Sequence, residues 1–278
     1  MKKKFPTLLL AMSLSFFGHA QSLEKVKGDR NVTKLLTAVP DFHTLILDEA
    51  FEIDLVYSKD ASVEIETDEN LHEVISFDVR DSILNLNLSK RITSKKRLRI
   101  TVNYNDFLST IETRDDAELH GISTLKSNKI NLTVSGNSKA GLTIKTDHFN
   151  FEGLDKSKTK LNVTSNTSKI ILNGNSSLEA LVNSGAATVD LYQRAQAEIE
   201  GSSNDLSVRT DNNAVFNGKN FTAKQGKLIS EIDSEITVEV TDSLDIEASG
   251  GSAIYLYGDP KIIVNKFTET AKIQKREK

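Results

Sequence analysis

The feature that most constrains this chain is a short phrase that recurs with a fixed internal layout. One copy reads SGGSAIYLYGDP and starts at Ser249, and another reads SGAATVDLYQ and starts at Ser184. Looser copies read SGNSKAGLTI and NGNSSLEALV. Aligning the first two pairs apolar residues at equal distances beyond a Ser-Gly step: Ile254 with Val189, and Leu256 with Leu191. A unit this short cannot enclose its own apolar side chains, so near copies must stack to build a core.

The apolar residues between these phrases alternate with polar ones throughout residues 107–267. Centres of alternation lie roughly nine to eleven residues apart, so two make a unit of roughly twenty, a period typical of solenoids. Gly, Asn and Asp between the centres favour turns, and alternating Ile, Val and Leu favour strands. The two prolines of the chain beyond its leader, Pro40 and Pro260, lie near the ends of the patterned region. We expect an all-β fold, a right-handed β-helix or β-solenoid with an N-terminal β section. A sandwich of two packed sheets is the alternative.

The chain begins with features of an export signal. Three lysines, Lys2 to Lys4, precede the apolar stretch Leu8–Phe17, and Gly18-His19-Ala20 resembles a cleavage site. The apolar stretch is too short to span a bilayer, and no second run of spanning length follows, so we expect no transmembrane segment. We expect an exported protein of the periplasm, the cell surface or the medium. The predicted segments are a signal peptide at 1–20, a flexible lead-in at 21–39, an N-terminal β section at 40–106, a repeat-containing β-solenoid at 107–267 and a basic tail at 268–278.

The charge and the cysteine content exclude some classes of partner and some sources of stability. Without the three leader lysines, 32 basic residues face 39 acidic ones, a net charge of −7. Such a surface repels nucleic acid, so we expect no nucleic-acid partner. The chain has no cysteine, so disulfides and thiolate metal sites contribute nothing. Burial and backbone pairing must hold the fold together.

The sequence shows no motif for catalysis, a metal or a cofactor. Carboxylates occur with arginine in two places: Arg114 with Asp115, Asp116 and Glu118, and Arg209 with Asp205 and Asp211. The neighbouring Asp115 and Asp116 would point to opposite faces of a strand, which prevents them from acting as a pair. The histidines beyond the leader are too scattered for metal-site spacing: His43, His72, His120 and His148. We expect a protein that is not an enzyme and holds no metal or cofactor. An extracytoplasmic enzyme acting on polysaccharide is the alternative, if carboxylates and arginine meet in one groove.

Three tyrosines are the candidate binding residues. Tyr192, Tyr255 and Tyr257 alternate with inward-pointing residues, so we expect their side chains to face outward. An exposed tyrosine offers apolar area with a polar end, which suits stacking on sugar rings or contact with a protein. The alternative is a cross-rung ladder that merely covers the strand ends.

Several stretches resemble those of a known family. The leader, FEIDLVYSKDASVEIETDENL, the paired Ser-Gly phrases and the SGGSAIYLYGDPKI ending are similar to the head GIN domain family of auto-transporter adhesins, also called domain of unknown function 2807. The resemblance extends over most of residues 40–270. It implies a β-helical, exported protein of the Bacteroidetes type without an established catalytic residue set. The implied function is adhesion or cell-envelope scaffolding through contact with glycan or an envelope protein, and a periplasmic envelope-signalling module is a further alternative.

Overall fold

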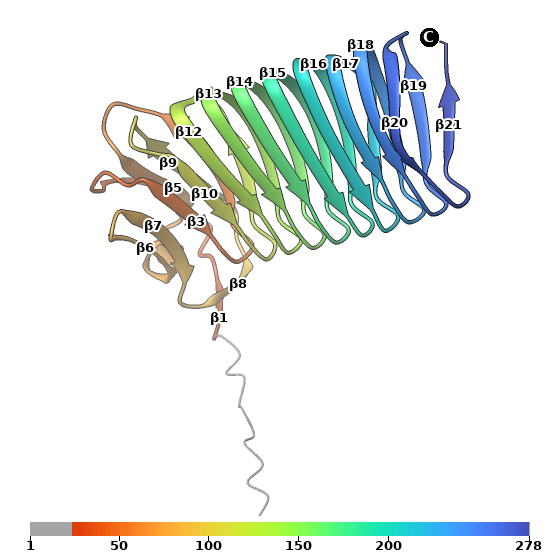
Figure 1. Ribbon diagram of the computed structural model, residues 1–278. Helices are drawn as coiled ribbons and strands as arrows, with labels where there is room; N and C mark the ends of the chain where they lie inside the picture. Colours follow the sequence, from red (N-terminus) through yellow and green to blue (C-terminus); the bar gives the residue numbers. More distant parts are fainter. Residues whose placement is uncertain (1–23, 278) are drawn as a thin grey trace, which may run out of the picture.

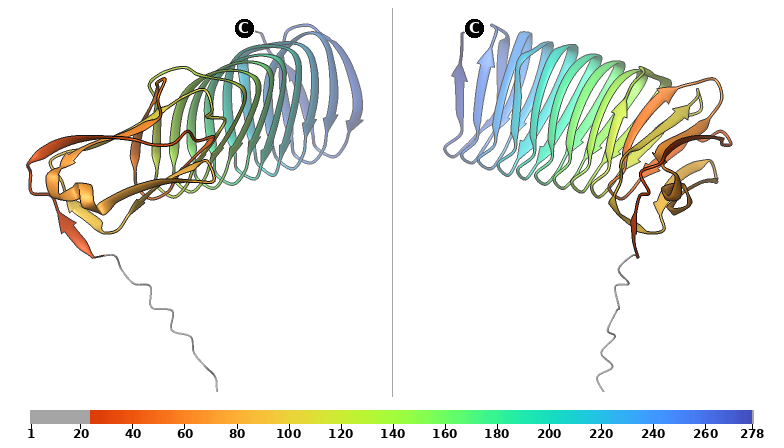
Figure 2. Two further views of the ribbon diagram at one scale, coloured as in Figure 1. Left: turned by 90° about the vertical axis from the view of Figure 1, so that its left-hand side faces the viewer. Right: turned by 180° about the vertical axis from the view of Figure 1, so that it is seen from behind.

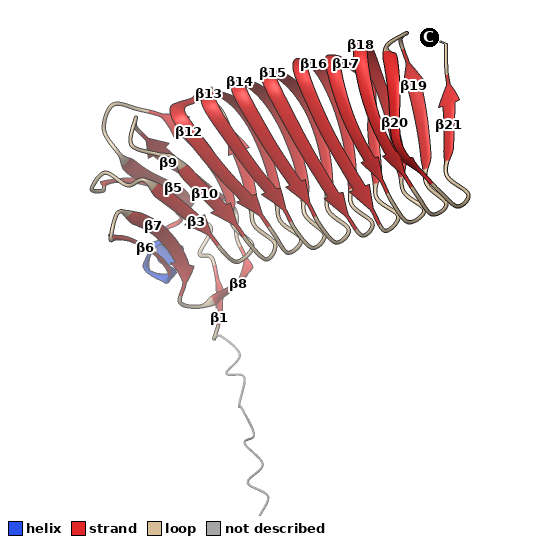
Figure 3. Ribbon diagram, in the orientation of Figure 1, coloured by secondary structure: helices blue, strands red, loops and turns tan. Residues whose placement is uncertain are grey.

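The computed structural model describes residues 24–277, which form one long stack of β-strands (Figure 1). The only helix of this range is the 3-10 segment η1 (Glu69–Val74), so the predicted all-β class is confirmed (Figure 3). The strands are β1 (Lys25–Lys27), β2 (Val32–Ala38), β3 (Thr44–Leu47), β4 (Glu52–Tyr57), β5 (Ser62–Asp68), β6 (Ile75–Arg80), β7 (Ile83–Leu88), β8 (Arg91–Ser94), β9 (Leu98–Tyr104), β10 (Thr110–Thr113), β11 (Glu118–Gly121), β12 (Leu125–Val134), β13 (Lys139–Gly153), β14 (Lys158–Leu172), β15 (Ser177–Tyr192), β16 (Gln196–Asp211), β17 (Val215–Ser230), β18 (Glu235–Ala248), β19 (Ala253–Tyr257), β20 (Lys261–Phe267) and β21 (Lys272–Lys275).

Each central strand forms nearly a whole turn of a solenoid. Strand β13 pairs in parallel with β14 on both sides of Asp147, where the chain bends from one face of the solenoid to the other. Lys139 pairs with Lys158, Lys158 with Ser177, and Ser177 with Gln196, so one turn takes 19 residues. We call such a turn of the solenoid a rung. The predicted β-solenoid is confirmed, and its unit of roughly twenty residues contains one apolar alternation on each face.

The core lies between the two faces and follows from the alternation. In β13, Leu142 and Ile144 point inward from one face and Phe149 and Phe151 from the other, and none is more than 5% exposed. Burial of one such side chain contributes about 1.5–3 kcal/mol, and the parallel ladders satisfy the backbone between rungs. The inward orientation predicted for Ile254 and Leu256 is confirmed, because they are 0% and 2% exposed.

A tight turn closes each rung at the edge opposite the bend. The residue with positive φ recurs at the same place in these turns: Glu49, Asp115, Gly136, Asp155, Gly174, Gln193, Asn212, Ile232, Gly250 and Glu269. From the second rung on, a small buried residue ends each turn: Ala117, Ser138, Ser157, Ser176, Ala195, Ala214, Ser234, Ser252 and Ala271. None of these small residues is more than 9% exposed, so from the second rung on the interior beside the turn is filled by Ser or Ala.

The two Ser-Gly phrases lie at opposite edges of the solenoid. Gly185 occupies the bend, where an added Cβ would lie 2.7 Å from the carbonyl oxygen of Asn166, whereas Gly250 has φ +71° in a turn. We call the face that precedes the bend in each rung the first face, and the face that follows it the second. Ile254 pairs with Ile236 on the first face, but Val189 pairs with Val208 on the second. The phrases are therefore not copies of one rung position. The two phrases look alike because a strand with alternating apolar residues begins after the bend as well as after the turn.

The solenoid starts and ends beyond the boundaries expected from the sequence. Thr44 pairs with Thr110 and Glu52 with Glu118, so β3 and β4 already form a rung inside the 40–106 section. Residues 62–104 are an insertion between the first and second rungs. Near the other end, β21 pairs in parallel with β19, although the sequence predicts a basic tail at 268–278. Strand β21 (KIQK) is short and charged, so it has little apolar alternation and its pairing depends on β19.

The described part of the expected flexible lead-in forms two strands. Strand β1 pairs with β8, and β2 pairs antiparallel with β5. Strand β5 in turn pairs antiparallel with β9, and β6 with β7, so antiparallel strands close this end of the stack (Figure 2). Residues 1–20, the expected signal peptide, lie outside the described residues.

Candidate binding groove

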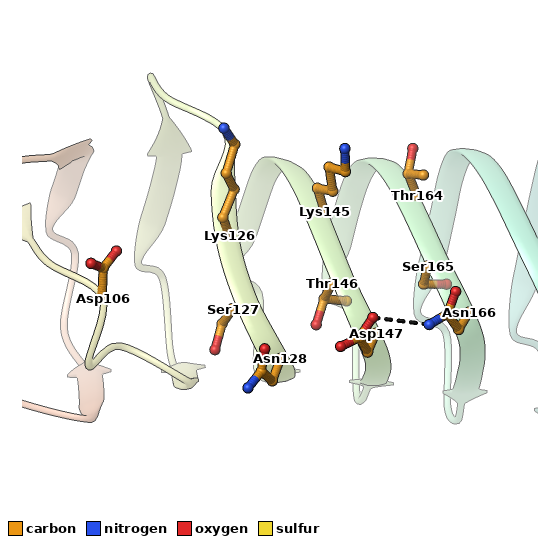
Figure 4. A pocket seen from close by; sticks show the side chains of 10 residues that line it. All are labelled: Asp106, Lys126, Ser127, Asn128, Lys145, Thr146, Asp147, Thr164, Ser165 and Asn166. Carbon is orange, nitrogen blue, oxygen red and sulfur yellow. Dashed lines mark hydrogen bonds between the residues drawn. The ribbon is translucent and has the colours of Figure 1, made fainter.

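A polar groove crosses successive rungs at the bend edge, close to the amino-terminal end of the solenoid (Figure 4). Its volume is about 660 Å³. The lining side chains are all polar or charged: Asp106, Lys126, Ser127, Asn128, Lys145, Thr146, Asp147, Thr164, Ser165 and Asn166. All except Asp106 come from β12, β13 and β14.

The 19-residue register arranges these side chains in rows. One row contains the exposed Lys126, Lys145 and Thr164, which are register partners on adjacent rungs. Adjacent rungs are about 4.8 Å apart, so the row places two lysines and a threonine hydroxyl side by side on neighbouring rungs. We call it the lysine row.

A second row follows the bend itself and contains Asn128, Asp147 and Asn166. The Nδ2 of Asn166 donates a hydrogen bond to Oδ1 of Asp147 at 2.9 Å (Figure 4). Between the two rows lie hydroxyl groups, of which Thr146 is only 8% exposed. Ser165 Oγ lies 2.7 Å from Ser168 Oγ, so this hydroxyl is already engaged within its rung. The groove therefore presents mainly the lysine row and the bend row to a ligand.

Three exposed apolar residues lie on segments joined to the Asp106 end of the groove, and we call them the rim. Tyr57, Phe107 and Ile122 form this rim and are 49%, 63% and 64% exposed. Ile122 N donates to Leu55 O at 2.9 Å, which brings the segment after β11 beside β4. The Tyr57 ring packs edge-on against Tyr104, with centroids 5.7 Å apart.

Asp106 connects the rim to the groove. It lines the groove and directly precedes Phe107 of the rim. Hydrogen bonding to Asp106, then its negative charge and burial, raises the pKa of Tyr57 above its usual value. The neutral phenol is therefore held beside the carboxylate, and the ring remains half exposed. Aromatic area next to paired donors and acceptors suits a ligand with one apolar face and many hydroxyl groups.

A second hollow, of about 690 Å³, lies where the insertion meets the first turns. Its apolar lining includes Phe51, which is 1% exposed, and Leu88, Ile92 and Leu98, which pack against the main core. We interpret this hollow as the junction between the insertion and the solenoid.

The structure separates the three predicted binding tyrosines. Tyr255 and Tyr257 alternate on β19, whereas Tyr192 ends β15 on the other face. The expectation that all three face outward is wrong for Tyr257, which is 8% exposed at the end of its strand, with Lys219 Nζ 5.8 Å from its ring centroid. Tyr192 and Tyr255 are partly exposed, with Arg209 and Arg276 over their rings at 6.0 and 4.2 Å. Their role in binding stays a prediction.

Of the groups considered for catalysis, Asp115 and Asp116 line the second hollow together with Glu49 and Arg91, whereas the two arginines considered are held in ion pairs. Arg114 Nη2 pairs with Glu112 Oε1 at 2.8 Å, and Arg209 Nη2 pairs with Glu231 Oε2 at 3.0 Å. Asp205 and Asp211 lie six residues apart along β16, roughly 20 Å. Paired carboxylates of glycosidases are about 5–9.5 Å apart. Within residues 24–277, no cluster of three or more His, Asp or Glu side chains could hold a metal ion.

The groove was missed in the sequence because its residues are separated by whole rungs. Lys126 and Lys145, or Asp147 and Asn166, look unrelated until the sequence is written in rows of 19. The bend also has no turn signal in the local sequence, because Asp147 lies inside one uninterrupted strand. A search for polar residues repeating at that period could have found both rows.

Solved structures resemble this fold at low sequence identity. A structure named a putative adhesin from Parabacteroides merdae has a TM-score of 0.67 at 14% identity, covering 91% of this chain and 100% of that one. Another putative adhesin, from Parabacteroides distasonis, has a TM-score of 0.65 at 16% identity, with 90% and 99% covered. A protein from the same species named a putative lipid binding protein has a TM-score of 0.59 at 15% identity, with 91% and 100% covered. At these identities the likeness concerns the fold alone. No curated protein matches this sequence.

The family comparison covers most of the chain. The sequence model described as "Putative auto-transporter adhesin, head GIN domain" matches residues 41–181 and, in a second overlapping match, residues 156–260. The two matches together extend from the first rung to the end of β19. Two overlapping matches on one chain also agree with a repeated unit. This chain therefore belongs to the head GIN domain family.

Proposed function

We propose that this protein is an exported, non-catalytic adhesin or cell-envelope binding module that holds a glycan in the groove at the bend edge. The observation that carries the proposal is that the lysine row and the bend row lie next to the exposed apolar rim. Lysine, carboxylate and amide groups can donate to and accept from neighbouring sugar hydroxyls, and the rim can cover the apolar face of a sugar ring.

The charge balance of the groove favours a neutral glycan. Two lysines, Lys126 and Lys145, stand with two aspartates, Asp106 and Asp147. A balanced site gains little from long-range attraction to a charged ligand, so binding should depend only weakly on ionic strength.

Export is supported by the leader-like features at residues 1–20 and by membership of an adhesin family. Within residues 24–277, no helix has the length and apolar character needed to cross a membrane. Arg114 and Arg209 are engaged in ion pairs with Glu112 and Glu231, which supports a role without catalysis. The polysaccharide-active enzyme remains the alternative.

The test is a glycan-array screen of residues 21–278, followed by titration of the strongest neutral oligosaccharide. Replacing both lysines in K126A/K145A should weaken binding by roughly tenfold or more, because a hydrogen bond to a charged group contributes about 1.5–3 kcal/mol and 1.4 kcal/mol is tenfold. Phe107→Ala should weaken binding severalfold through loss of the rim.

The matched control is K156A/K158A, which removes two exposed lysines at the turn edge. It should bind like the parent protein. Equal losses in both double variants, or binding unaffected by K126A/K145A, would place the glycan elsewhere. Release of shortened products from the bound oligosaccharide would support the enzyme alternative.

A further inference from the structure

The carboxy-terminal end of the solenoid is formed by β19, β20 and β21 (Figure 1), and it leaves core positions of β20 exposed. Strand β20 pairs in parallel with β18 along one edge. The next strand, β21, pairs with β19 and so extends only the first face. Among residues 24–277, no strand pairs with the other edge of β20.

The uncovered positions are the ones that build the core in earlier rungs. Ile262, Val264 and Phe267 are register partners of Leu244, Ile246 and Ala248, which are at most 1% exposed. The three β20 residues are instead 44%, 49% and 48% exposed. Their exposure follows from the missing neighbour, because the same inward positions are covered in every central rung.

At the opposite end of the solenoid, the inward residues of the last strands are covered. There, β5 pairs antiparallel with β9, and its inward residues Val63 and Ile65 are 0% and 2% exposed. A solenoid end with a free strand edge and exposed apolar residues is a template for a further strand.

The charge of this end differs from that of the chain. Residues 261–277 contain five basic and two acidic side chains, a net charge of +3, whereas the whole chain has a net charge of −4. Two of the lysines, Lys261 and Lys266, belong to β20 itself and are exposed. A second copy of the same end would bring these lysines to an equally basic edge, so the charge disfavours self-association.

The strand that β20 already accepts has the complementary charge. On β18, Glu247 pairs with Lys266 and Asp245 with Ile263, while Leu244 and Ile246 point into the core. This neighbour is therefore an acidic strand with alternating apolar residues.

We propose that the free edge of β20 binds an extended acidic segment of another protein, which adds to the solenoid as a further strand. Its apolar residues cover Ile262, Val264 and Phe267, and its carboxylates lie beside Lys261 and Lys266. Lysines also protect strand edges from unwanted pairing. However, an edge that is protected from pairing often carries a charged residue at an inward position. The inward positions of β20 are all apolar, so they favour pairing with a further strand. This surface lies at the far end of the stack from the groove, so the proposal does not depend on glycan binding.

The test uses a fluorescein-labelled peptide with the sequence of residues 242–249, DSLDIEAS, in a fluorescence-anisotropy titration against residues 21–278. The peptide should bind saturably, and a version with lysine at its three acidic positions should bind at least about tenfold more weakly. The charge-reversed protein K261E/K266E should invert this preference. The control K156E/K158E, at the turn edge, should keep the parent preference.

A second variant separates the apolar contribution from the charge. Val264→Lys places a charge at a half-exposed inward position, so the solenoid should fold normally and lose the peptide. Absence of saturable binding to the parent protein, or binding that neither K261E/K266E nor Val264→Lys changes, would overturn the proposal. A concentration-dependent dimer in sedimentation equilibrium that Val264→Lys abolishes would also overturn it and assign this end to a second copy.

Discussion

At the scale of single residues, the turn edge sets strict limits on size and conformation. The position that ends each turn is filled by Ser or Ala from the second rung on, and it is buried each time. The hydroxyl groups of Ser157, Ser176 and Ser252 have no hydrogen-bond partner among the described residues. Ser138 and Ser234 do donate hydrogen bonds, to Ser135 O and Glu231 O at 2.6 Å. Because Ala and unpartnered Ser fill the same position, a hydroxyl group is not required there, and the common feature is small volume.

Ser176 tests this account of the turn. Ser176→Ala should leave stability unchanged or raise it by up to about 1 kcal/mol, because an unpartnered buried hydroxyl is lost. Ser176→Val should destabilise by about 1–3 kcal/mol through overpacking. Urea denaturation followed by circular dichroism measures both. The account fails if Val is tolerated as well as Ala, which already fills the equivalent position at Ala195 and Ala214.

At the scale of elements, one buried carboxylate ties the amino-terminal strands to the solenoid end. Asp68 is 0% exposed, and its carboxylate accepts hydrogen bonds from the backbone N–H groups of Arg30, Lys96 and Arg97 at 3.1–3.3 Å. An added Cβ at Gly28 would lie 1.9 Å from Asp68 Oδ2, so only glycine allows the chain to pass there. Asp68 thus joins the start of β2 to the loop before β9.

The pH dependence of this junction follows from the pKa of Asp68. Burial raises that pKa, but the backbone donors from Lys96, Arg30 and Arg97 outweigh burial, so it lies below its usual value. A carboxyl with a depressed native pKa stabilises the fold fully above its unfolded pKa of about 3.9. The stabilisation is lost as the pH falls through the lower native pKa.

Asp68→Asn should therefore destabilise the junction at pH 7 and flatten the loss of stability below about pH 4. Hydrogen exchange at residues 25–38 and 91–97 measures the local stability of the junction. Urea denaturation from pH 7 to pH 2.5 measures how the free energy of unfolding depends on pH. Asp60→Asn, at an exposed loop position, is the control. If Asp68→Asn loses stability below about pH 4 as steeply as the parent protein does, the loss comes from other carboxyl groups.

The elements also show how far the sequence could predict the fold. The long strands β13 to β18 were predictable, because alternation on both faces repeats every 19 residues or nearly so. Strands β1 and β2 were not, because their residues are mostly exposed and their pairing comes from β8 and β5, far along the chain. The junction through Asp68 links residues 28 to 38 positions apart, which no local pattern reveals.

At the scale of the whole molecule, stacking converts a sequence period into surface rows. The lysine row and the bend row exist because residues 19 apart become neighbours on adjacent rungs. The chemistry of the groove was therefore hidden in the sequence, although its residue types were visible. The alternation that predicts the three tyrosines is local to single strands, so it cannot show that Tyr257 is buried or that Tyr192 lies on the other face.

Spin-label distances across the rungs test the stacking most directly, because the chain has no cysteine to interfere. The exposed residues Lys158, Gln196 and Lys272 belong to one register row, with Lys272 six rungs from Lys158 and four from Gln196. Double electron–electron resonance on K158C/K272C and Q196C/K272C should give about 29 Å and about 19 Å, at about 4.8 Å per rung. Equal distances in the two variants, or a shorter one for K158C/K272C, would contradict the solenoid and every surface derived from it.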